Sequence, residues 1–469
     1  MKKTSNDLRE MNTVKGRQSS QGDSIHGEPV KSVSGGEKAD VLITSQISES
    51  LLLLSETLME QVCERSNMLE SLRRVKRNKG SAGVDGMTVY ELPDYLKRHW
   101  PEIKSSLLEG RYIPRSVKRV EIPKSDGKGR RKLGIPCVLD RLIQQALLQV
   151  LQREWDSRFS ARSYGFRPNR SAHQAIAQSQ RDVELGYEYV VDIDLEQFFD
   201  QVHHDRLMSR LSERIVDKRV LTLIRRYLKT GIMESGLERV PMKGTPQGGP
   251  LSPFLSNVVL DELDQELSSR GHRYVRYADD CRIYVRSARA GDRVMKSVTR
   301  FIETRLKLRV NESKSAVAPA RNRSFLGYGL TGGRWPNRRK ISLESLKRFR
   351  AQVRRLTRRN WSLSLSERIK RLSSYLRGWR GYYGYCETRR VLVDLDSWIR
   401  RRLRSVIWKQ WKVYGRRKRE LRKLGVRKDL AQTTAWSAKG PWCMSHSPGV
   451  NMALNNRYFD SQGLVRLAL

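Results

Sequence analysis

The sequence predicts an α+β protein with an antiparallel sheet in its middle part and helices in its C-terminal part. Two alternating apolar runs, His272–Arg276 and Cys281–Val285, flank a short polar link and indicate a β-hairpin. Residues Tyr187–Asp194 predict a further strand that leads into an acidic and aromatic turn. From Ser342 onward the pattern indicates several basic helices. Strands followed by a run of helices are typical of the α+β class.

The N-terminal part of the chain begins with a polar segment. Residues 1 to about 45 are rich in Ser, Gly, Lys, Gln and Asp and contain no aromatic residue. We interpret them as a disordered tail, or as translated sequence without a structural role. Ser48–Lys76 then predicts a helix, Val117–Ile122 a strand and Ser125–Gly127 a turn. The apolar stripe of that helix consists of Leu51, Leu54, Leu58 and Val62.

Two stronger helical patterns follow in the middle of the chain. Asp140–Glu154 has the spacing of an amphipathic helix, and Pro250–Leu267 predicts another helix. The basic helices after Ser342 are expected to break near Asn360, Gly381 and Gly415.

Charge points to a polyanionic partner. The chain has 92 Lys and Arg against 50 Asp and Glu, and its pI is about 10.5. Half of the excess lies in residues 341–430, with 28 basic and 7 acidic residues. A charge run alone also fits a solvated helix face, but here aromatic residues are interleaved, which favours a surface that binds phosphates and stacks bases. These aromatic residues are Trp361, Tyr375, Trp379, Tyr382, Tyr383, Tyr385, Trp398, Trp408 and Trp411.

Other classes of protein are disfavoured. No apolar run approaches the roughly 20 residues that a membrane span needs, and the N-terminus lacks the apolar core of a signal peptide. The five cysteines are scattered without CxxC spacing, so neither a zinc site nor a disulfide framework is indicated. We therefore expect a cytoplasmic protein with no membrane partner.

The polar link of the hairpin, Tyr277–Asp280, holds two adjacent carboxylates. Like charges side by side repel unless a cation lies between them. Magnesium prefers carboxylate oxygens and is usually shared with substrate phosphates. Asp279 and Asp280 therefore suggest a two-metal site for nucleotidyl transfer.

A third carboxylate is expected at the end of the strand Tyr187–Asp194. Alternation places Asp192 and Asp194 on the same face, so periodicity does not choose between them, and Asp200 is also near. An acid that caps the following turn is the simpler alternative for this motif.

The loop Gly244–Pro253 is rich in glycine and proline. Glycine lets a backbone approach a flat ligand closely, and Pro250 and Pro253 stiffen the entry into the next helix. In isolation, a plain structural loop explains it equally well.

In combination, these three motifs resemble a known family. Asp194 to Phe199 (Asp-x-x-x-x-Phe), the Gln-Gly-Gly-Pro loop and Tyr-Ala-Asp-Asp occur in the order found in a reverse transcriptase, and more narrowly in a bacterial group II intron-encoded reverse transcriptase and maturase. The resemblance runs from about Met68 to the C-terminus. It includes the blocks Gly80–Gly86, Ile122–Lys124, Arg131–Pro136, Ser163–Pro168, Asn311–Ser315 and Phe325–Gly327.

The resemblance implies the roles of the site residues. Asp194, Asp279 and Asp280 would hold two Mg²⁺ ions, and Phe199 would be the steric gate that rejects a 2′-OH. The other roles are a contact of Gln247 with the template–nucleotide pair, a triphosphate clamp of Lys124 and Arg131, and protonation of the pyrophosphate by Lys314, which is otherwise an ordinary surface lysine.

The C-terminal part resembles the maturase, or X, segment of the family. The resemblance lies in Arg377–Tyr383, Trp398–Arg404 and Trp408–Lys412, and Arg416–Lys428 resembles the DNA-binding region. With no paired cysteines after it, we expect no His-Asn-His endonuclease and a similarity to the compact group IIC type. Implied partners are the intron RNA, an RNA template with a DNA primer, deoxynucleoside triphosphates and target DNA.

The fold that the resemblance implies is a right-hand polymerase with a basic C-terminal helical region. Its expected parts are the tail (1–45), the fingers (46–180), the palm with the catalytic centre (181–335), the thumb or maturase domain (336–412) and the DNA-binding region (413–469). Two alternatives stay open. One is a maturase-only RNA-binding protein, and the other is a related reverse transcriptase recruited to host defence or DNA repair.

Overall fold

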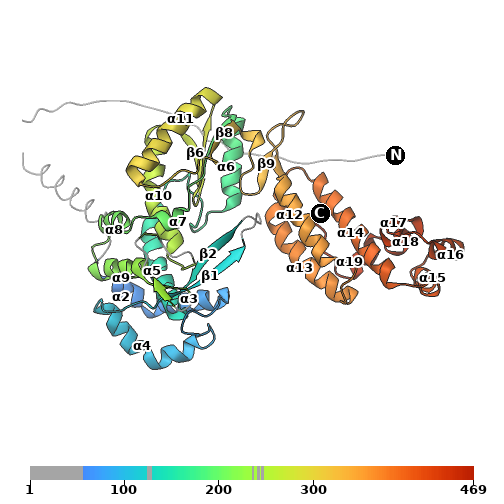
Figure 1. Ribbon diagram of the computed structural model, residues 1–469, viewed down its shortest axis with the longest axis horizontal. Helices are drawn as coiled ribbons and strands as arrows, with labels where there is room; N and C mark the ends of the chain where they lie inside the picture. Colours follow the sequence, from blue (N-terminus) through green and yellow to red (C-terminus); the bar gives the residue numbers. More distant parts are fainter. Residues whose placement is uncertain (1–55, 124–128, 235–236, 240–242, 245–247, 469) are drawn as a thin grey trace, which may run out of the picture. The chain divides into compact units, whose positions relative to one another are not determined.

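The computed structural model describes residues 56–123, 129–234, 237–239, 243–244 and 248–468 (Figure 1). The predicted tail of residues 1–45 and the predicted turn Ser125–Gly127 lie outside these residues. The described part combines many helices with mainly antiparallel sheets, which confirms the α+β class.

The first helices form two elements where the sequence predicts one. Glu64 has an extended ψ of 137° and separates α2 from α3, so the prediction of a single helix over Ser48–Lys76 is wrong there. The Asn67 side-chain amide donates to the Val62 carbonyl oxygen at 2.9 Å, and this competes with the backbone bond of a continuous helix. The elements are α2 (Leu58–Cys63), α3 (Arg65–Asn78) and α4 (Leu92–Leu108).

A four-stranded sheet in the order β2-β1-β4-β5 follows. The predicted strand Val117–Ile122 is confirmed as part of β1, which pairs antiparallel with β2 and parallel with β4. The strands are β1 (Val117–Pro123), β2 (Arg130–Ile135), β4 (Ile232–Glu234) and β5 (Leu237–Arg239).

Helix α5 (Val138–Trp155) is buried on most of its circumference and confirms the predicted helix Asp140–Glu154. Helix α10 (Ser252–Ser269) likewise confirms the helix predicted over Pro250–Leu267, with a proline in its first turn. The other helices of this part are α6 (Ala172–Glu184), α7 (Phe198–Gln201), α8 (His204–Ser212), α9 (Lys218–Lys229) and α11 (Ala288–Phe301).

The second four-stranded sheet is antiparallel throughout, in the order β6-β7-β3-β8. Successive side chains point to opposite faces. Val191 and Ile283 belong to a core shared with α10 and α11, whereas Val190 and Tyr284 belong to a second core shared with α6 (Figure 1). The strands are β3 (Tyr189–Ile193), β6 (Arg273–Tyr277), β7 (Asp280–Val285) and β8 (Ala316–Pro319).

A short hairpin and a series of helices complete the chain. The helix breaks predicted near Asn360, Gly381 and Gly415 are confirmed to within a few residues, because the helices are interrupted at residues 357–364, 384–389 and 411–413. The elements are β9 (Tyr328–Leu330), β10 (Arg339–Ile341), α12 (Leu343–Leu356), α13 (Leu365–Tyr383), α14 (Arg390–Gln410), α15 (Tyr414–Lys423), α16 (Lys428–Trp436), α17 (Pro441–Met444), α18 (Pro448–Ala453) and α19 (Asn456–Ser461).

Most aromatic residues of these basic helices belong to the core. Trp379, Trp408 and Trp411 are buried, and Tyr382 and Tyr383 pack against it. The sequence-based prediction that the aromatic residues of 341–430 form a base-stacking surface is therefore wrong for Trp379, Trp408 and Trp411, whereas the other six keep part of their surface exposed. A base cannot stack on an indole that other side chains already cover.

Candidate active site

The two adjacent carboxylates lie at the tip of the β6–β7 hairpin. Tyr277 pairs with Asp280, so only two residues, Ala278 and Asp279, form the turn, and the predicted hairpin is confirmed. Ala278 adopts a left-handed conformation with φ 59°, as tight two-residue turns require. The turn presents the exposed Asp279 and the partly exposed Asp280.

A buried arginine supports this turn from inside. Arg276 forms a bidentate ion pair with Asp264 of α10, at 2.8 Å and 2.5 Å, and both side chains are fully buried. The same guanidinium donates to the side chain of Asn257 and to the carbonyl oxygen of Ala278, each at 2.9 Å. Arg276 therefore ties the hairpin turn to α10. Sequence reasoning did not single out this residue.

The segment Ser163–Pro168 packs along the other side of the turn. A Cβ on Gly165 would lie 2.2 Å from the backbone nitrogen of Ala278, so only glycine fits here. Asn257 donates to the Gly165 carbonyl oxygen at 2.9 Å. The block that the family resemblance identified thus has a structural role in placing the hairpin.

Asp194 follows β3 directly, and the segment before β8 fixes its backbone. Its N–H donates to the Ser315 hydroxyl at 3.0 Å, and its carbonyl oxygen accepts from the Asn311 N–H at 2.8 Å. Its carboxylate lies 3.6 Å from the Lys314 ammonium. The predicted residues Asp194 and Lys314 are therefore neighbours.

The structure sets Asp192 apart from the other two acids that the sequence left open. Asp192 is occupied by ion pairs with Arg282 and Arg323, at 3.0 Å and 2.9 Å, and its side chain is only 14% exposed. Asp194 and Asp200 both line the open cleft. This arrangement favours Asp194 over Asp192 as the acid available to a ligand.

Burial, reinforced by neighbouring acids, raises the pKa of two carboxyl groups at this edge of the sheet. Burial raises the pKa of Asp194, which Lys314 opposes and Asp279 reinforces. Burial raises the pKa of Asp280 to about 7, opposed by Arg282 and reinforced by Asp192, Asp279 and Asp194. The negative charges at this edge of the sheet are therefore close enough to disfavour one another.

These residues line a cleft of about 700 Å³. Basic side chains of β1 and β2, Arg119, Arg130 and Lys132, line it together with the acidic group. Sequence reasoning missed these three as site residues, and the run of basic residues Arg130–Lys132 was the only visible signal for them. The remaining lining residues are Phe166, Asp194, Leu195, Glu196, Gln197, Phe198, Phe199, Asp200, Asp279, Asn311 and Lys314.

Three predicted nucleotide-binding residues are not placed. Lys124 and Gln247 lie outside the described residues, and so does the side chain of Arg131. The backbone of Arg131 belongs to β2, where it pairs with Ile122.

Phe199 lies in the short helix α7 and lines the cleft. Its ring packs edge-on against the buried Phe198, with centroids 5.3 Å apart. Gly244 fits closely behind it, because a Cβ there would lie 2.9 Å from the Phe199 carbonyl oxygen. The predicted steric gate is therefore held between the core and the glycine-rich loop.

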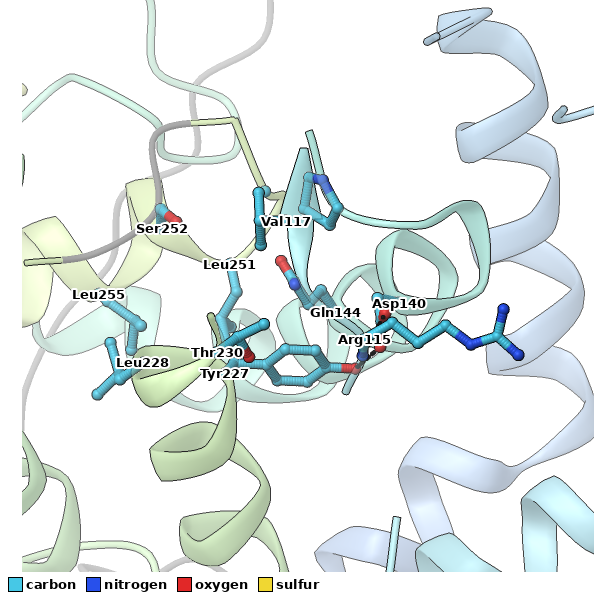
Figure 2. A pocket seen from close by; sticks show the side chains of 12 residues that line it. Arg115, Val117, Asp140, Gln144, Tyr227, Leu228, Thr230, Leu251, Ser252 and Leu255 are labelled. Atoms are coloured by element: carbon cyan, nitrogen blue, oxygen red, sulfur yellow. Dashed lines mark hydrogen bonds between the residues drawn. The ribbon is translucent and has the colours of Figure 1, made fainter. Parts of the chain in front are cut away.

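Gly249, near the end of that loop, packs against a buried polar cluster. A Cβ on Gly249 would lie 2.3 Å from the Gln144 side-chain oxygen of α5. Gln144, Tyr227 and Leu251 are among the residues that line a cavity of about 20 Å³ (Figure 2). The glycines thus permit close packing of the loop, which does not by itself show contact with a ligand.

The buried acid of this cluster is Asp140. It accepts hydrogen bonds from the Tyr112 hydroxyl at 2.9 Å, the Tyr227 hydroxyl at 3.3 Å and the Arg115 N–H at 3.2 Å. Burial raises the pKa of Asp140 to about 6, against the lowering effect of Tyr112. The cluster joins α5 and α9 to the start of β1.

The acidic group has the donor chemistry of a divalent cation site. Asp194 and Asp279 line the same cleft, and carboxylate oxygens are the ligands that Mg²⁺ prefers. Across the described ranges, no three His, Cys, Asp or Glu side chains are close enough together to hold a metal ion. The donor types fit a divalent cation, while its coordination stays a prediction.

Within the part of the chain that the structure describes, no helix is both long enough and apolar enough to cross a bilayer.

Two known protein families match consecutive parts of the chain. The family described as reverse transcriptase (RNA-dependent DNA polymerase) matches residues 122–330, which include the cleft carboxylates. The family described as group II intron, maturase-specific domain matches residues 346–425.

Individual proteins show the same similarity. Protein YkfC of Escherichia coli is 32% identical over 357 residues, which cover 67% of this chain and 93% of that protein. The group II intron-encoded protein LtrA of Lactococcus lactis subsp. cremoris is 29% identical over 321 residues, which cover 54% of this chain and 53% of LtrA. A chain of a partial Cas6-RT-Cas1–Cas2 complex is 25% identical, covering 53% of this chain and 42% of that chain, but its TM-score is only 0.31.

Proposed function

Because this chain belongs to the family of group II intron-encoded proteins that combine a reverse transcriptase with a maturase domain, we propose that it copies RNA into DNA in the cleft beside Asp194 and Asp279. One observation carries the proposal: the cleft combines carboxylates from two strands with basic side chains of β1 and β2. Polymerisation needs both, since acids hold metal ions and cationic groups bind phosphates.

The metal site that we propose consists of Asp194, Asp279 and Asp280. Two bound Mg²⁺ ions would neutralise the charge that develops on the reacting phosphate and lower the pKa of the primer 3′-hydroxyl. The protein's own contribution is to hold the carboxylates in place through the Arg276–Asp264 ion pair and the hydrogen bonds of Asp194.

The nucleotide would lie between the acids and the β1–β2 strands. Arg119, Arg130 and Lys132 line the cleft and are suited to phosphate oxygens, together with the predicted clamp residues Lys124 and Arg131. Neutralising a triphosphate where it binds would offset the cost of removing its charges from water.

Three further side chains would select and complete the reaction. Phe199 would lie under the sugar, where its ring would exclude a 2′-hydroxyl. The close packing of Gly244 against its backbone would keep the ring in place. Gln247 would contact the template–nucleotide pair. Lys314 would donate a proton to the pyrophosphate, and its position 3.6 Å from Asp194 places an ammonium at the cleft wall.

We also propose the subdomain limits that the family resemblance implies. The fingers would cover residues 46–180, the palm 181–335, the thumb or maturase domain 336–412 and the DNA-binding region 413–469. The antiparallel sheet β6-β7-β3-β8 falls within the proposed palm, and helices α12 and α13 fall within the proposed thumb.

The proposed partners follow from the two matched domains. The polymerase would use an RNA template with a DNA primer and deoxynucleoside triphosphates, and the basic helices would hold folded intron RNA and target DNA. Assistance to splicing would be a binding function, since the RNA supplies the splicing chemistry.

Primer extension tests the proposal directly. Full-length protein is given an RNA template annealed to a DNA primer, MgCl₂ and deoxynucleotides. We expect extension by the wild type and at least about a 100-fold loss in Asp279→Ala. The substitution would remove a carboxylate that holds a metal ion, and that ion would stabilise the charge of the transition state. The control Asp292→Ala removes an exposed acid of α11 and should leave extension unchanged.

A wild-type protein that does not extend the primer but still binds structured RNA tightly would contradict the polymerase proposal. A maturase-only protein would then remain.

A further inference from the structure

An exposed tryptophan marks a surface away from the polymerase cleft. Trp335 lies in the tip of the β9–β10 hairpin, residues Thr331–Arg338, and is 58% exposed. It does not line the cleft. Three of the five tryptophans that the sequence suggested for base stacking are buried, whereas Trp335 is exposed.

Two guanidinium groups accompany this ring. The Arg338 Cζ lies 4.7 Å from the centroid of the Trp335 ring, and the Arg334 Cζ lies 5.7 Å from it. Both arginines are exposed. Cation–π contacts of this kind hold a charged group beside an aromatic face without neutralising its charge.

The surroundings contain little negative charge. The sequence has no Asp or Glu between Glu312 and Glu344, whereas this stretch holds seven Lys and Arg. Among the residues that the structure describes, neither Arg334 nor Arg338 forms an ion pair with an acidic side chain. The tip therefore favours an anionic partner.

The tip is held in one conformation by its own hydrogen bonds. The Thr331 N–H donates to the Arg338 carbonyl oxygen at 2.9 Å, and the Asn337 N–H donates to the Thr331 carbonyl oxygen at 2.9 Å. Asn337 and Gly333 take left-handed conformations, with φ 61° and 70°. A fixed tip loses little conformational entropy when it binds.

Packing does not explain the exposed ring. The base of the hairpin, with Tyr328, Leu330 and Ile341, is already buried in the core beside α12 and α13. An exposed tryptophan at the tip contributes nothing to that core.

We propose that Trp335, Arg334 and Arg338 bind an unpaired base of folded RNA, with the ring stacked on the base and the guanidinium groups on the adjoining phosphates. A free base offers a face that a paired and stacked base does not, and single-stranded loops are where proteins read RNA. The inference deepens the proposed RNA-binding function and rests on it. It assigns that binding to a site outside the polymerase cleft.

The test compares two RNA probes by fluorescence anisotropy. One is an RNA hairpin with 2-aminopurine in an unpaired loop, and the other is a fully paired RNA duplex with the same stem. We expect Trp335→Ala to weaken binding of the looped probe about 5- to 100-fold, as loss of one stacked base implies. Quenching of the 2-aminopurine should be lost together with the affinity.

Two matched variants serve as controls. Trp335→Phe keeps an aromatic face and should retain most of the affinity. Tyr90→Ala removes another exposed aromatic side chain, 66% exposed, whose neighbours include Glu91 and Asp94 instead of arginines. It should bind both probes as the wild type does.

Several outcomes would overturn the inference. The first is unchanged affinity of Trp335→Ala for the looped probe. The second is an equal loss of affinity for the paired duplex, which would indicate binding to a duplex backbone. The third is an equal loss of affinity in Tyr90→Ala. Primer extension on an unstructured template distinguishes failure of this inference from failure of the proposed polymerase function. Extension should persist in Trp335→Ala, and its loss there would place Trp335 in the catalytic part instead.

Discussion

Two fully buried arginines show how differently the sheet region and the maturase helices treat charge. Arg276, beneath the turn of the β6–β7 hairpin, is paired with the Asp264 carboxylate. Arg368 of α13 is equally buried, but it donates only to carbonyl oxygens, those of Leu356, Arg358 and Trp361, at 3.3, 2.8 and 2.9 Å. The first arrangement is electrically neutral, whereas the second leaves a net positive charge inside the protein.

This difference has a functional consequence. In the sheet region, a neutral support keeps the field at the hairpin negative, as cation binding requires. In the maturase helices, carbonyl groups surround Arg368, so its charge is not cancelled locally. Residues 341–430 contain 28 basic and 7 acidic residues, and this excess of positive charge attracts a polyanion.

The largest effect is expected from breaking the neutral pair. Arg276→Met should lower the free energy of unfolding by about 3–5 kcal/mol, because it leaves the Asp264 carboxylate buried without its counter-charge. Adding Asp264→Leu to the same chain should recover part of that loss. Urea denaturation followed by tryptophan fluorescence measures both, and primer extension reports whether the turn keeps its shape.

If the double variant were no more stable than Arg276→Met, the unpaired carboxylate would not be the cause. The ion pair would then matter mainly through its hydrogen bonds to Asn257 and Ala278.

A second prediction concerns the opposite case, a buried carboxyl group that no cationic side chain contacts within the described part of the chain. Asp140 is 1% exposed, its pKa is raised to about 6, and neutral donors surround it. Because the folded protein holds this proton more tightly than the unfolded chain, stability should fall as pH rises from about 4 to 6. The expected loss is about 3 kcal/mol from this residue.

Asp140→Asn should remove that part of the pH dependence. The difference in unfolding free energy between variant and wild type, measured at pH 4 and at pH 7, isolates it, because Asp261 and Asp280 titrate in both proteins. A difference that does not change with pH would show that Asp140 is ionised throughout.

The sequence predicted the sheet region better than the packing of the maturase helices. The hairpin was predictable because alternation and a two-residue turn are local properties, and Asp279 and Asp280 are adjacent in the chain. Asp194 could be separated from Asp192 only through the family resemblance. The physical reason, the pairing of Asp192 with Arg282 and Arg323, is tertiary.

Burial of the aromatic residues could not be predicted in the same way. Trp408 and Trp335 both stand beside arginines, yet Trp408 is fully buried and Trp335 is 58% exposed. Composition does not distinguish them, because burial depends on which helices pack together. The glycine and proline residues around Trp335 were the local signal of an exposed turn.

The smallest of the three effects is expected at Arg368. Arg368→Met should cost about 2 kcal/mol, less than Arg276→Met, because it removes hydrogen bonds to three carbonyl groups but leaves no unpaired charge. Burial already lowers the pKa of this arginine, so part of the lost bonding is offset when the charge is removed. The same denaturation assay ranks the losses of unfolding free energy. The control is Arg371→Met, which changes an exposed arginine of the same helix. If Arg368→Met instead proved as costly as Arg276→Met, carbonyl oxygens would stabilise a buried guanidinium as well as a carboxylate does, and the contrast between the two regions would be lost.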